Sequence, residues 1–286
     1  MHLNIFVSPK CFCYCSGCYS LSRQESCKNP LSSKIIVKFL KYAFANGIYK
    51  VTLCGGDPLT RNDILSLLKK IKKIGFYISI DTMGTTIVRN AKIGNYTFKK
   101  IDVDKLVEYV DMIGIPIDGT DDKTINYFRN SFTGVYNEQL LICDVLHSKG
   151  ANLCINTVLN KGNVNEIEKL TVLINNLQYI KKWQFFEFVP SGIVALANRS
   201  KFELDKGEFS KCQSYIIDNC TNENLKLEFK TISSRNSLYM LIDNSGYAWI
   251  FSENNNKKND RKIIGNIKNK NDWEKICLYL KREEKL

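Results

Sequence analysis

The chain reads Cys11-Phe12-Cys13-Tyr14-Cys15-Ser16-Gly17-Cys18 close to its amino terminus. Cys11, Cys15 and Cys18 have the spacing C-x3-C-x2-C, which allows three thiolates of one tight loop to bind three irons of a cubane iron–sulfur cluster. The fourth iron then has no protein ligand and can bind a small molecule, whereas clusters that only transfer electrons usually have four cysteine ligands. Cys13 lies two residues from both Cys11 and Cys15, so we expect it to point away from the cluster or to be a free thiol.

Other uses of these cysteines stay open at this point. Zinc sites usually consist of two C-x2-4-C pairs separated by a longer loop, and the second pair is missing here. Histidine, the other common zinc ligand, occurs only as His2 and His147. A disulfide framework is disfavoured because 11 cysteines is an odd number and a chain of 286 residues can build a core without cross-links. The spacing therefore favours an iron–sulfur cluster over zinc and over plain buried thiols.

Length and composition limit the class of protein. A chain of 286 residues with 44% apolar residues suits one large domain, or one domain with a small extension. No apolar run approaches the ~20 residues of a membrane span, and the first ten residues contain too short an apolar stretch for a secretory signal. We therefore expect a cytoplasmic protein with reduced thiols and no membrane partner.

The net charge of +12 raises the possibility of a nucleic-acid partner. The lysines are scattered over the whole chain, however, and those at 69–73 lie on a predicted, solvated helix. Nucleic acid is therefore disfavoured as a partner. An anionic small substrate or an acidic peptide would use the same positive field.

Strand-like and helix-like segments alternate over the first 190 or so residues, which predicts βα units and a parallel sheet. The strands are rich in Val, Ile and Leu, as in a sheet that is covered on both faces. The helices show apolar residues at helical spacing and end at glycines such as Gly47 and Gly75. The predicted strands are 3–7, 50–54, 76–80, 112–117, 152–159 and 183–189, and the predicted helices are 32–46, 62–74, 104–110, 122–129, 136–149 and 166–176.

Two parts of the chain do not follow this pattern. The polar insert 85–100 contains no predicted element. Near the carboxyl terminus, 238–242 and 247–251 flank Asp243-Asn244-Ser245-Gly246, a turn sequence that predicts a β-hairpin. Residues 272–285 are expected to form a closing helix.

A glycine motif, Gly55-Gly56-Asp57-Pro58, ends the second predicted strand. Two glycines allow the backbone to approach a ligand closely, the proline restricts the turn, and backbone carbonyls together with Asp57 could hold an ammonium group. The motif lacks the features of a phosphate-binding loop or a dinucleotide fingerprint. A Gly-Gly pair is more often a simple turn, but folds with parallel strands place their chemistry at the carboxyl ends of those strands.

Together, the cysteine loop after the first strand and Gly-Gly-Asp-Pro after the second resemble the two signature motifs of the radical S-adenosylmethionine (radical SAM) superfamily, which has Glu where this chain has Asp57. The resemblance covers about 190 residues. It implies an α/β fold, a partial (β/α)6 TIM-like barrel over residues 1–200, with a small C-terminal α+β extension, residues 201–286, that covers the barrel opening. It also implies a [4Fe-4S] cluster on Cys11, Cys15 and Cys18.

In this family the amino and carboxylate groups of S-adenosylmethionine bind the fourth iron. Reductive cleavage then gives methionine and a 5′-deoxyadenosyl radical that abstracts a hydrogen atom from a substrate. Such an enzyme needs an external reductant, for which a flavodoxin- or ferredoxin-type protein is expected. The family usually has an aromatic residue just before the third cysteine, next to the adenine. Gly17 takes that position here, so Tyr14 and Tyr19 are the candidates for this contact.

Other strand ends supply further candidates for cofactor binding. Asp81-Thr82 follows the third strand, where family members place polar groups near the cofactor, although an ordinary turn would look the same. Arg129 follows Asp118-Gly119 as in peptide-maturing members and could bind the methionine carboxylate through two hydrogen bonds, or form a salt bridge on the helix surface. Asn156 could reach the cofactor or be a half-buried strand residue. The expected cofactor-binding residues are thus Gly55, Gly56, Asp57, Pro58, Asp81, Thr82, Arg129 and Asn156.

The substrate is expected to be a ribosomally made peptide or a nucleotide. The last third of the chain contains only Cys212, Cys220 and Cys277, too few for the auxiliary clusters of many peptide-maturing members. The chain therefore resembles a viperin-like or peptide-maturase-like branch without an auxiliary-cluster domain; viperin-type enzymes act on nucleoside triphosphates. A second class of function stays open, a non-catalytic zinc-binding protein with a basic nucleic-acid-binding surface. The segments similar in order to viperin-like proteins are 183–190, 198–199, 202–204 and 237–243.

Overall fold

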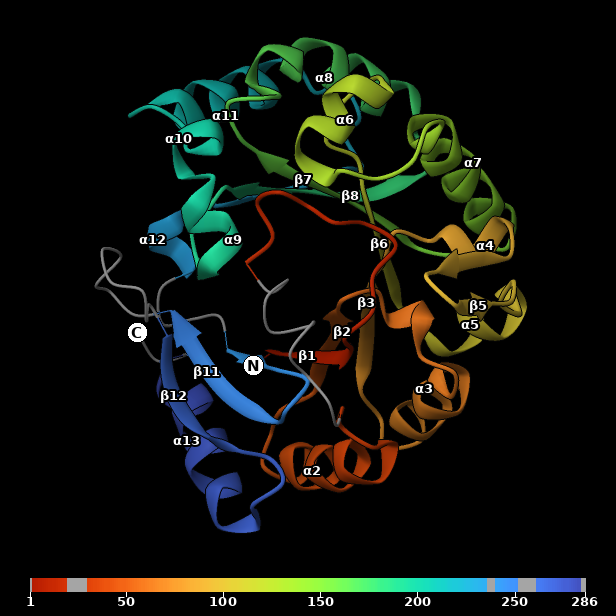
Figure 1. The fold of residues 1–286 in the computed structure, drawn as a ribbon, viewed down its shortest axis with the longest axis vertical. Helices are drawn as coiled ribbons and strands as arrows, with labels where there is room; N and C mark the ends of the chain where they lie inside the picture. Colours follow the sequence, from red (N-terminus) through yellow and green to blue (C-terminus); the bar gives the residue numbers. More distant parts are fainter. Residues whose placement is uncertain (1, 20–29, 236–239, 252–260, 284–286) are drawn as a thin grey trace.

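The structure is a computed structural model that describes residues 2–19, 30–235, 240–251 and 261–283, and the statements below concern these residues. One curved sheet has the strand order β12-β11-β10-β1-β2-β3-β6-β7-β8-β9, and helices surround its outer face (Figure 1). Within the described residues, every helix is too short or too polar to cross a membrane.

The predicted partial (β/α)6 barrel is confirmed. Six parallel strands follow one another in the sheet, and each is joined to the next by one or more helices on the outside. The strands are β1 (His2–Ser8), β2 (Lys50–Gly55), β3 (Tyr77–Asp81), β6 (Met112–Pro116), β7 (Leu153–Leu159) and β8 (Ile180–Glu187), and the helices are α2 (Ser33–Ala45), α3 (Ile64–Lys72), α5 (Val103–Tyr109), α6 (Asp122–Arg129), α7 (Val135–Ser148) and α8 (Ile167–Asn176).

The helices begin where local capping residues allow. The Ser32 side chain accepts a hydrogen bond from the backbone N–H of Ile35 and caps α2, and Asp121 does the same for α6 through the N–H of Thr124. Such caps satisfy backbone donors that have no partner inside the helix. Each long helix then buries one apolar face against the sheet, which in α2 consists of Ile36, Phe39, Leu40 and Ala43.

The insert 85–100, for which no element was predicted, contains regular structure. It forms α4 (Thr85–Val88) and a two-stranded hairpin of β4 (Ala91–Ile93) and β5 (Tyr96–Phe98). These elements are too short to produce a periodic pattern in the sequence. The ring of Phe98 packs edge-on against Phe12, with 5.7 Å between centroids, so the hairpin lies against the start of the cysteine loop.

Residues after 200 extend the sheet at both edges. At one edge β9 (Lys226–Lys230) pairs in parallel with β8, and at the other β10 (Leu241–Ile242) pairs in parallel with β1. Because this one sheet continues past residue 200, the division of the chain at that point stays a prediction. The remaining helices are α9 (Gly192–Ala197), α10 (Arg199–Phe202), α11 (Glu208–Asn219), α12 (Ile232–Arg235) and α13 (Trp273–Glu283).

The predicted hairpin near the carboxyl terminus is confirmed, since β10 pairs antiparallel with β11 (Tyr247–Phe251). Residues 237–239 of the predicted segments lie outside the described residues. A further strand, β12 (Arg261–Asn266), pairs with β11 and was not predicted. Figure 1 shows β11, β12 and α13 together on one side of the barrel, and β10 joins this group to β1, so the last part of the sheet packs on the start of the chain.

Strand β8 shows how the sheet separates two environments. Trp183 and Phe185 are fully buried among the core residues, whereas Lys182 and Gln184, at alternate positions, line a cavity inside the barrel. The Trp183 indole N–H donates to the Thr157 hydroxyl at 2.9 Å, so Thr157 belongs to the core rather than to a ligand site. The outer face of the sheet is therefore the apolar core, and its inner face carries polar groups.

Candidate active site

One cavity of about 200 Å³ at the carboxyl ends of the strands gathers most of the predicted site residues. We call it the cysteine cavity. All four cysteines of the loop line it, as do the ends of β2 and β3. Asp57 and Pro58 do not line it. The predicted residues around it are Cys11, Cys15, Cys18, Gly55, Gly56, Asp81, Thr82, Arg129 and Asn156.

The cysteine loop sits on the carboxyl end of α6. The backbone N–H of Ser16 donates to the carbonyl oxygen of Phe128 at 2.9 Å, and the backbone N–H of Tyr14 donates to the carbonyl oxygen of Asn130 at 3.3 Å. Carbonyl groups at the end of a helix have no partner within the helix, so the loop satisfies them. Asn130 ends the helix with a left-handed φ of 45°. This contact brings the last residue of α6, Arg129, to the cysteines.

The cysteines differ in their acidity. A hydrogen bond from Cys13 lowers the pKa of Cys15 to about 7, helped by the positive charge of Arg129 and opposed by burial. The pKa of Cys13 is raised well above its usual value by its hydrogen bonds to Cys11 and Cys15 and by burial. Cys15 thus forms the thiolate, the form that binds metals, more readily than Cys13 does. Cys13 is buried, lines the cavity and forms no disulfide, so the alternative of a free thiol is confirmed.

The donor set fits a cubane cluster better than a single metal ion. In the described part of the chain, no three Cys, His, Asp or Glu side chains are gathered closely enough to share one ion. A cubane requires a wider arrangement, because each thiolate binds a different iron at a separate corner. Cys11, Cys15 and Cys18 line one cavity with no histidine among its lining residues, and thiolates are the ligands that iron–sulfur clusters prefer.

The glycine motif pairs with the chain that leads into the cysteine loop. The N–H of Gly56 donates to the carbonyl oxygen of Ser8 at 2.8 Å, and the N–H of Asp57 donates to the carbonyl oxygen of Lys10 at 2.6 Å. A Cβ atom added to Gly56 would lie 2.1 Å from the Lys10 oxygen. The glycine is therefore needed where two backbones meet, and this contact fixes the second motif against the first.

Asp57 and Pro58 lie behind the cavity wall. The Asp57 carboxylate is fully buried and accepts hydrogen bonds from the Leu59 N–H (2.9 Å), the Thr82 hydroxyl (2.7 Å) and the Met83 N–H (2.9 Å). Burial raises its pKa, and the hydrogen bonds oppose this rise. Pro58 begins the short 3-10 helix η1 (Pro58–Thr60). Asp57 thus positions the end of β3, and the structure does not direct its carboxylate at a ligand in the cavity.

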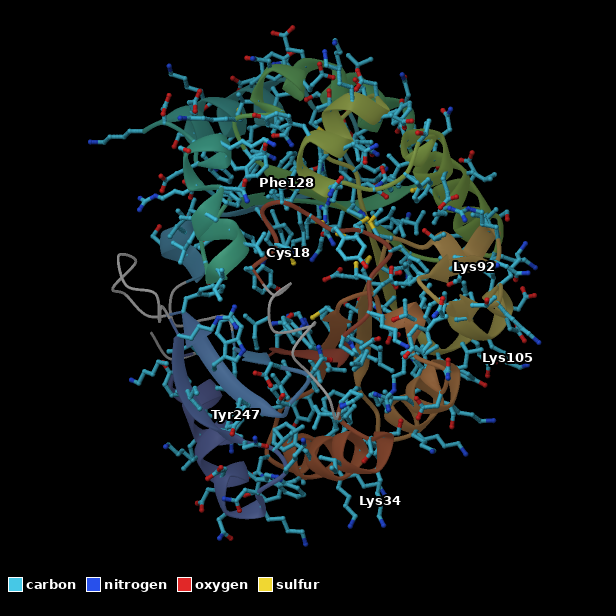
Figure 2. All side chains as sticks on the ribbon, viewed as in Figure 1. Cys18, Lys34, Lys92, Lys105, Phe128 and Tyr247 are labelled. Carbon is cyan, nitrogen blue, oxygen red and sulfur yellow. The ribbon has the colours of Figure 1, made fainter. Side chains whose placement is uncertain are left out.

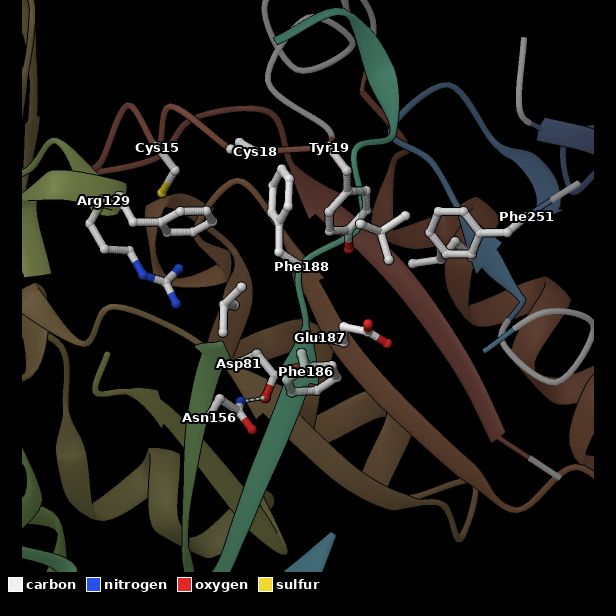
Figure 3. A pocket seen from close by; sticks show the side chains of 15 residues that line it. Cys15, Cys18, Tyr19, Asp81, Arg129, Asn156, Phe186, Glu187, Phe188 and Phe251 are labelled. Atoms are coloured by element: carbon white, nitrogen blue, oxygen red, sulfur yellow. Dashed lines mark hydrogen bonds between the residues drawn. The ribbon is translucent and has the colours of Figure 1, made fainter. Parts of the chain in front are cut away.

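Asp81 and Asn156 form a pair on the cavity wall. The Asn156 side-chain amide donates to an Asp81 carboxylate oxygen at 2.9 Å (Figure 3). Burial raises the pKa of Asp81 to about 6, opposed by this hydrogen bond and by Lys182. A Cβ atom at Gly114 would lie 2.2 Å from the Asp81 oxygen and 2.6 Å from the Asn156 nitrogen. Sequence reasoning missed Gly114, although a glycine inside a buried strand is a signal of close approach.

Arg129 forms an ion pair with Asp118. The Asp118 side chain is 1% exposed and the Arg129 side chain 15%, so the interpretation as a salt bridge on the helix surface is wrong. The second Asp118 oxygen accepts from the Val158 N–H at 2.7 Å. Burial lowers the pKa of Arg129, but Asp118 and Cys15 raise it by more. Figure 3 shows the guanidinium below Cys15, where it places a positive charge beside the thiol.

A second pocket, the aromatic pocket, adjoins the cysteine cavity and shares Cys15, Arg129 and Asn156 with it (Figure 3). A Cβ atom at Gly17 would lie 2.2 Å from the Phe128 ring and 2.8 Å from the Phe188 ring. These rings fill the space that an aromatic side chain at position 17 would need, and sequence reasoning missed both. Of the two tyrosines predicted for this contact, Tyr19 lines both pockets, whereas Tyr14 lines neither and is 52% exposed.

A third cavity, of about 530 Å³, lies inside the barrel at the amino ends of the strands. Five lysines and only two carboxylates, Asp81 and Glu228, line it, and we call it the lysine chamber. Asp81 also lines the cysteine cavity and the aromatic pocket, so the three spaces meet at this residue. The charged residues and histidine of the chamber are His2, Lys50, Asp81, Lys181, Lys182, Lys226, Glu228 and Lys230.

The lysine chamber keeps an excess of positive charge. The Glu228 carboxylate lies 3.0 Å from the Nζ atoms of both Lys182 and Lys226 and 3.4 Å from that of Lys230. Burial raises the pKa of Glu228, but these lysines lower it to about 2. The pKa of His2 is lowered to about 4 by burial and by Lys230, Lys182 and Lys50. One carboxylate shared by three ammonium groups cannot neutralise them, so the chamber is suited to an anion.

Comparisons with known proteins identify the family of this chain. Residues 5–174 match the family described as the Radical SAM superfamily. The S-adenosylmethionine-dependent nucleotide dehydratase of Flammeovirga pacifica is 21% identical over 251 residues, which are 85% of this chain and 80% of that protein. The AdoMet-dependent heme synthase of Methanosarcina barkeri is 26% identical over 187 residues, 65% of this chain and 50% of that protein.

Solved structures share the fold. Streptococcus suis SuiB bound to S-adenosylmethionine superimposes with a TM-score of 0.67 at 18% identity, covering 86% of this chain and 59% of SuiB. Native anSMEcpe with bound AdoMet has a TM-score of 0.67 at 15% identity and covers 100% of this chain and 85% of that chain. Enzymes of this family use a [4Fe-4S] cluster and S-adenosylmethionine. With 170 of its residues matched to the family and the fold shared, this chain belongs to the radical SAM superfamily.

Proposed function

We propose that this protein is a radical SAM enzyme that abstracts a hydrogen atom from a nucleotide whose phosphates bind in the lysine chamber. The observation that carries this proposal is the excess of five lysines over two carboxylates in a chamber that meets the cysteine cavity at Asp81. A polyphosphate is a ligand that such a charge distribution favours, because ammonium groups pair with phosphate oxygens as point charges.

The cysteine cavity would hold the cofactors. Cys11, Cys15 and Cys18 are the proposed ligands of a [4Fe-4S] cluster, and the lowered pKa of Cys15 makes its thiolate easier to form. When bound, S-adenosylmethionine supplies a carbon radical that can take a hydrogen atom from a substrate. Arg129, held in place by the buried Asp118, would bind the carboxylate of this cofactor. Gly55 and Gly56 offer backbone groups at the cavity wall, while Asp57 and Pro58 keep this wall in position.

The remaining residues would orient the nucleotide and exclude water. Lys182 on β8 lies opposite Lys226 on β9, and Lys50 reaches the same chamber from β2, so phosphates would be held between distant strands. Asp81, which lines both cavities, and its partner Asn156 would bind hydroxyl groups, while Thr82 uses its hydroxyl to hold Asp57. The rings of Phe128 and Phe188 keep water from the reacting atoms, which a reactive radical requires.

The relatives support a nucleotide more than a peptide. The nucleotide dehydratase of Flammeovirga pacifica aligns over 85% of this chain, whereas a peptide substrate has its support in structural neighbours that share the fold at low identity. The proposal includes a flavodoxin- or ferredoxin-type electron donor and a cytoplasmic location, because iron–sulfur clusters held by thiolates survive in reducing compartments.

Binding of nucleoside triphosphates to the anaerobically reconstituted protein tests the proposal. We expect equilibrium dialysis to show binding of at least one of the common ribonucleoside triphosphates, and Lys182→Ala to weaken it by about tenfold or more. Lys34→Ala removes a lysine from the outer face of α2 and is expected to change nothing. A protein that binds none of these nucleotides but forms 5′-deoxyadenosine when given a peptide would overturn the nucleotide assignment. Stoichiometric zinc in place of iron would favour the non-catalytic alternative.

A further inference from the structure

We propose that the β4–β5 hairpin and the start of the cysteine loop form the docking surface for a small acidic electron-transfer protein of the flavodoxin type. We call this the hairpin surface. The inference rests on the proposed function, because it assumes a cluster in the cysteine cavity that receives an electron from outside. The residues of the hairpin surface are Lys10, Tyr14, Lys92, Tyr96, Lys99 and Lys100.

The hairpin touches the segment that carries the proposed cluster ligands. The Lys10 Nζ atom lies 3.0 Å from the centre of the Tyr96 ring, and Phe12 packs edge-on against Phe98. Lys10 directly precedes Cys11, and Phe12 directly follows it. In Figure 1 the hairpin lies with α4 and α5 on one side of the barrel. A protein bound to the hairpin would therefore stand next to the cysteine loop.

The hairpin surface is strongly basic. Residues 84–101 contain four cations and no Asp or Glu, and residues 9–19 contain Lys10 and no acidic residue. Arg89 is paired with Glu138. Among the residues that the structure describes, Lys10, Lys92, Lys99 and Lys100 form no ion pair. Cations without an ion-pair partner attract an acidic protein and steer its approach.

Exposed aromatic rings add to the case for a protein partner. Tyr96, on the hairpin, is 58% exposed and lies under the Lys10 ammonium group, and Tyr14, on the cysteine loop, is 52% exposed. Tyrosine is enriched at protein interfaces because it offers a large apolar ring with a polar end. A surface with two exposed tyrosines and four unpaired lysines thus has the composition of a docking site for an acidic protein.

Other basic regions are less suited to this task. Lys34 and Lys38 lie on the outer face of α2, and Figure 2 shows Lys34 and Lys92 on different sides of the molecule. The lysines of the chamber line a cavity inside the barrel, where a folded protein cannot enter. Electron transfer slows steeply with distance, so a productive complex must form beside the cysteine loop. In the transfer, the reduced flavin of the partner loses one electron and the cluster gains it, and no bond forms or breaks.

A binding titration tests the proposal without depending on activity. The probe is flavodoxin in its oxidised form with flavin mononucleotide bound, titrated by calorimetry at low ionic strength. We expect the double variant Lys92→Glu, Lys99→Glu to bind it at least about tenfold more weakly than the wild type and to lose most of the salt dependence of binding. The matched control Lys34→Glu, Lys38→Glu changes the net charge equally and is expected to bind as the wild type does.

Reduction provides a second readout. With dithionite as electron donor, we expect the Lys92→Glu, Lys99→Glu variant to cleave S-adenosylmethionine at the wild-type rate, and with reduced flavodoxin we expect a clear loss. Wild-type affinity in this variant, an equal loss in the α2 control, or no binding by the wild type would each overturn the proposal. Failure of the proposed nucleotide substrate would appear only in the dialysis experiment and would leave the flavodoxin titration interpretable.

Discussion

The cysteine cavity takes its proposed metal ligands from residues 11–18, whereas the lysine chamber takes its lysines from β2, β8 and β9, between Lys50 and Lys230. The first region is visible as a spacing in the sequence, because the ligands share one loop. The second exists only when strands that are far apart in the sequence pair in the right register, as β8 and β9 do when Lys182 lies opposite Lys226. The two regions meet at Asp81, and the predictions below separate what each contributes.

The largest effect is expected from the cysteine loop. Cys15→Ala removes one of three thiolates, so we expect loss of bound iron and of all cleavage of S-adenosylmethionine, because a cluster with two thiolates is labile. Cys13→Ala should keep both the bound iron and the cleavage of S-adenosylmethionine. Iron and sulfide analysis and the visible absorption of the anaerobically reconstituted protein measure this. The reverse pattern, with the cluster lost in Cys13→Ala and kept in Cys15→Ala, would contradict the ligand assignment.

Gly56→Ala tests how firmly the glycine motif is joined to the cysteine loop. The added Cβ atom would lie 2.1 Å from the Lys10 carbonyl oxygen, a rigid backbone atom. We expect the free energy of unfolding of the apoprotein to fall by about 2–4 kcal/mol. Gly207→Ala, at a left-handed residue in open space, is the control and should cost about 1 kcal/mol. Urea unfolding under reducing conditions gives both values, and equal costs would show that the close contact is unimportant.

Asp81→Asn tests the residue shared by both regions. Burial raises the pKa of Asp81 from 3.8 to about 6, so the folded state binds this proton more tightly than the unfolded state. Stability from this group is present at low pH and is lost as the pH rises through about 4 to 6. Asn does not titrate in this range. The free energy of unfolding of the variant, relative to that of the wild type, should therefore be higher at about pH 8 than at about pH 4, by up to about 3 kcal/mol.

The check on Asp81 is urea unfolding of the apoprotein across this pH range. Asp218→Asn changes an exposed carboxylate on α11 and serves as the matched control. A difference between Asp81→Asn and the wild type that does not vary with pH would argue against a raised pKa.

The smallest effect probes the field of the lysine chamber directly. The pKa of His2 is lowered to about 4, mainly by burial, and among the charged groups Lys230 contributes most to this shift. In Lys230→Ala we expect this pKa to rise by about 0.5, toward the ordinary value of histidine. Nuclear magnetic resonance of the imidazole protons measures it, and His147, stacked on Tyr179 away from the chamber, is the internal reference. An unchanged pKa of His2 would mean that the charge of Lys230 does not contribute to the electrostatic field in the chamber.

Much of the fold could be predicted because its signals are local. Ser32 and Asp121 cap their helices through neighbouring backbone groups, and apolar periodicity marks the buried faces. The hairpin of β4 and β5 was missed because each strand has only three residues, and the strand β9 was missed because its pairing partner, β8, is distant in the sequence. Lys226-Leu227-Glu228-Phe229-Lys230 does alternate charged and apolar residues, as a strand does. That alternation was the available signal for both β9 and the inward-facing lysines.

The site could be predicted less completely than the fold. Nine of the eleven expected residues line the cysteine cavity, because strand ends and the loop after β1 must meet at the same edge of a parallel sheet. The Asp57 carboxylate was expected to contact the cofactor, but it accepts hydrogen bonds from the Thr82 hydroxyl and the Met83 N–H instead. Whether a carboxylate at a strand end turns toward the cavity or toward the next strand depends on which donors lie nearby, and for Asp57 two of the three come from residues 25 and 26 positions away.

The sequence alone determined the thiolate trio, the order of the βα units and the strand ends that carry polar residues, since each depends on neighbouring residues or on a short period along the chain. Only the tertiary structure decided that Phe128 and Phe188 fill the space beside Gly17, that Asp118 buries its pair with Arg129, and that lysines of three distant strands share one chamber. These features follow from the curvature of the sheet and the register of its strands, which bring together side chains that no local pattern connects.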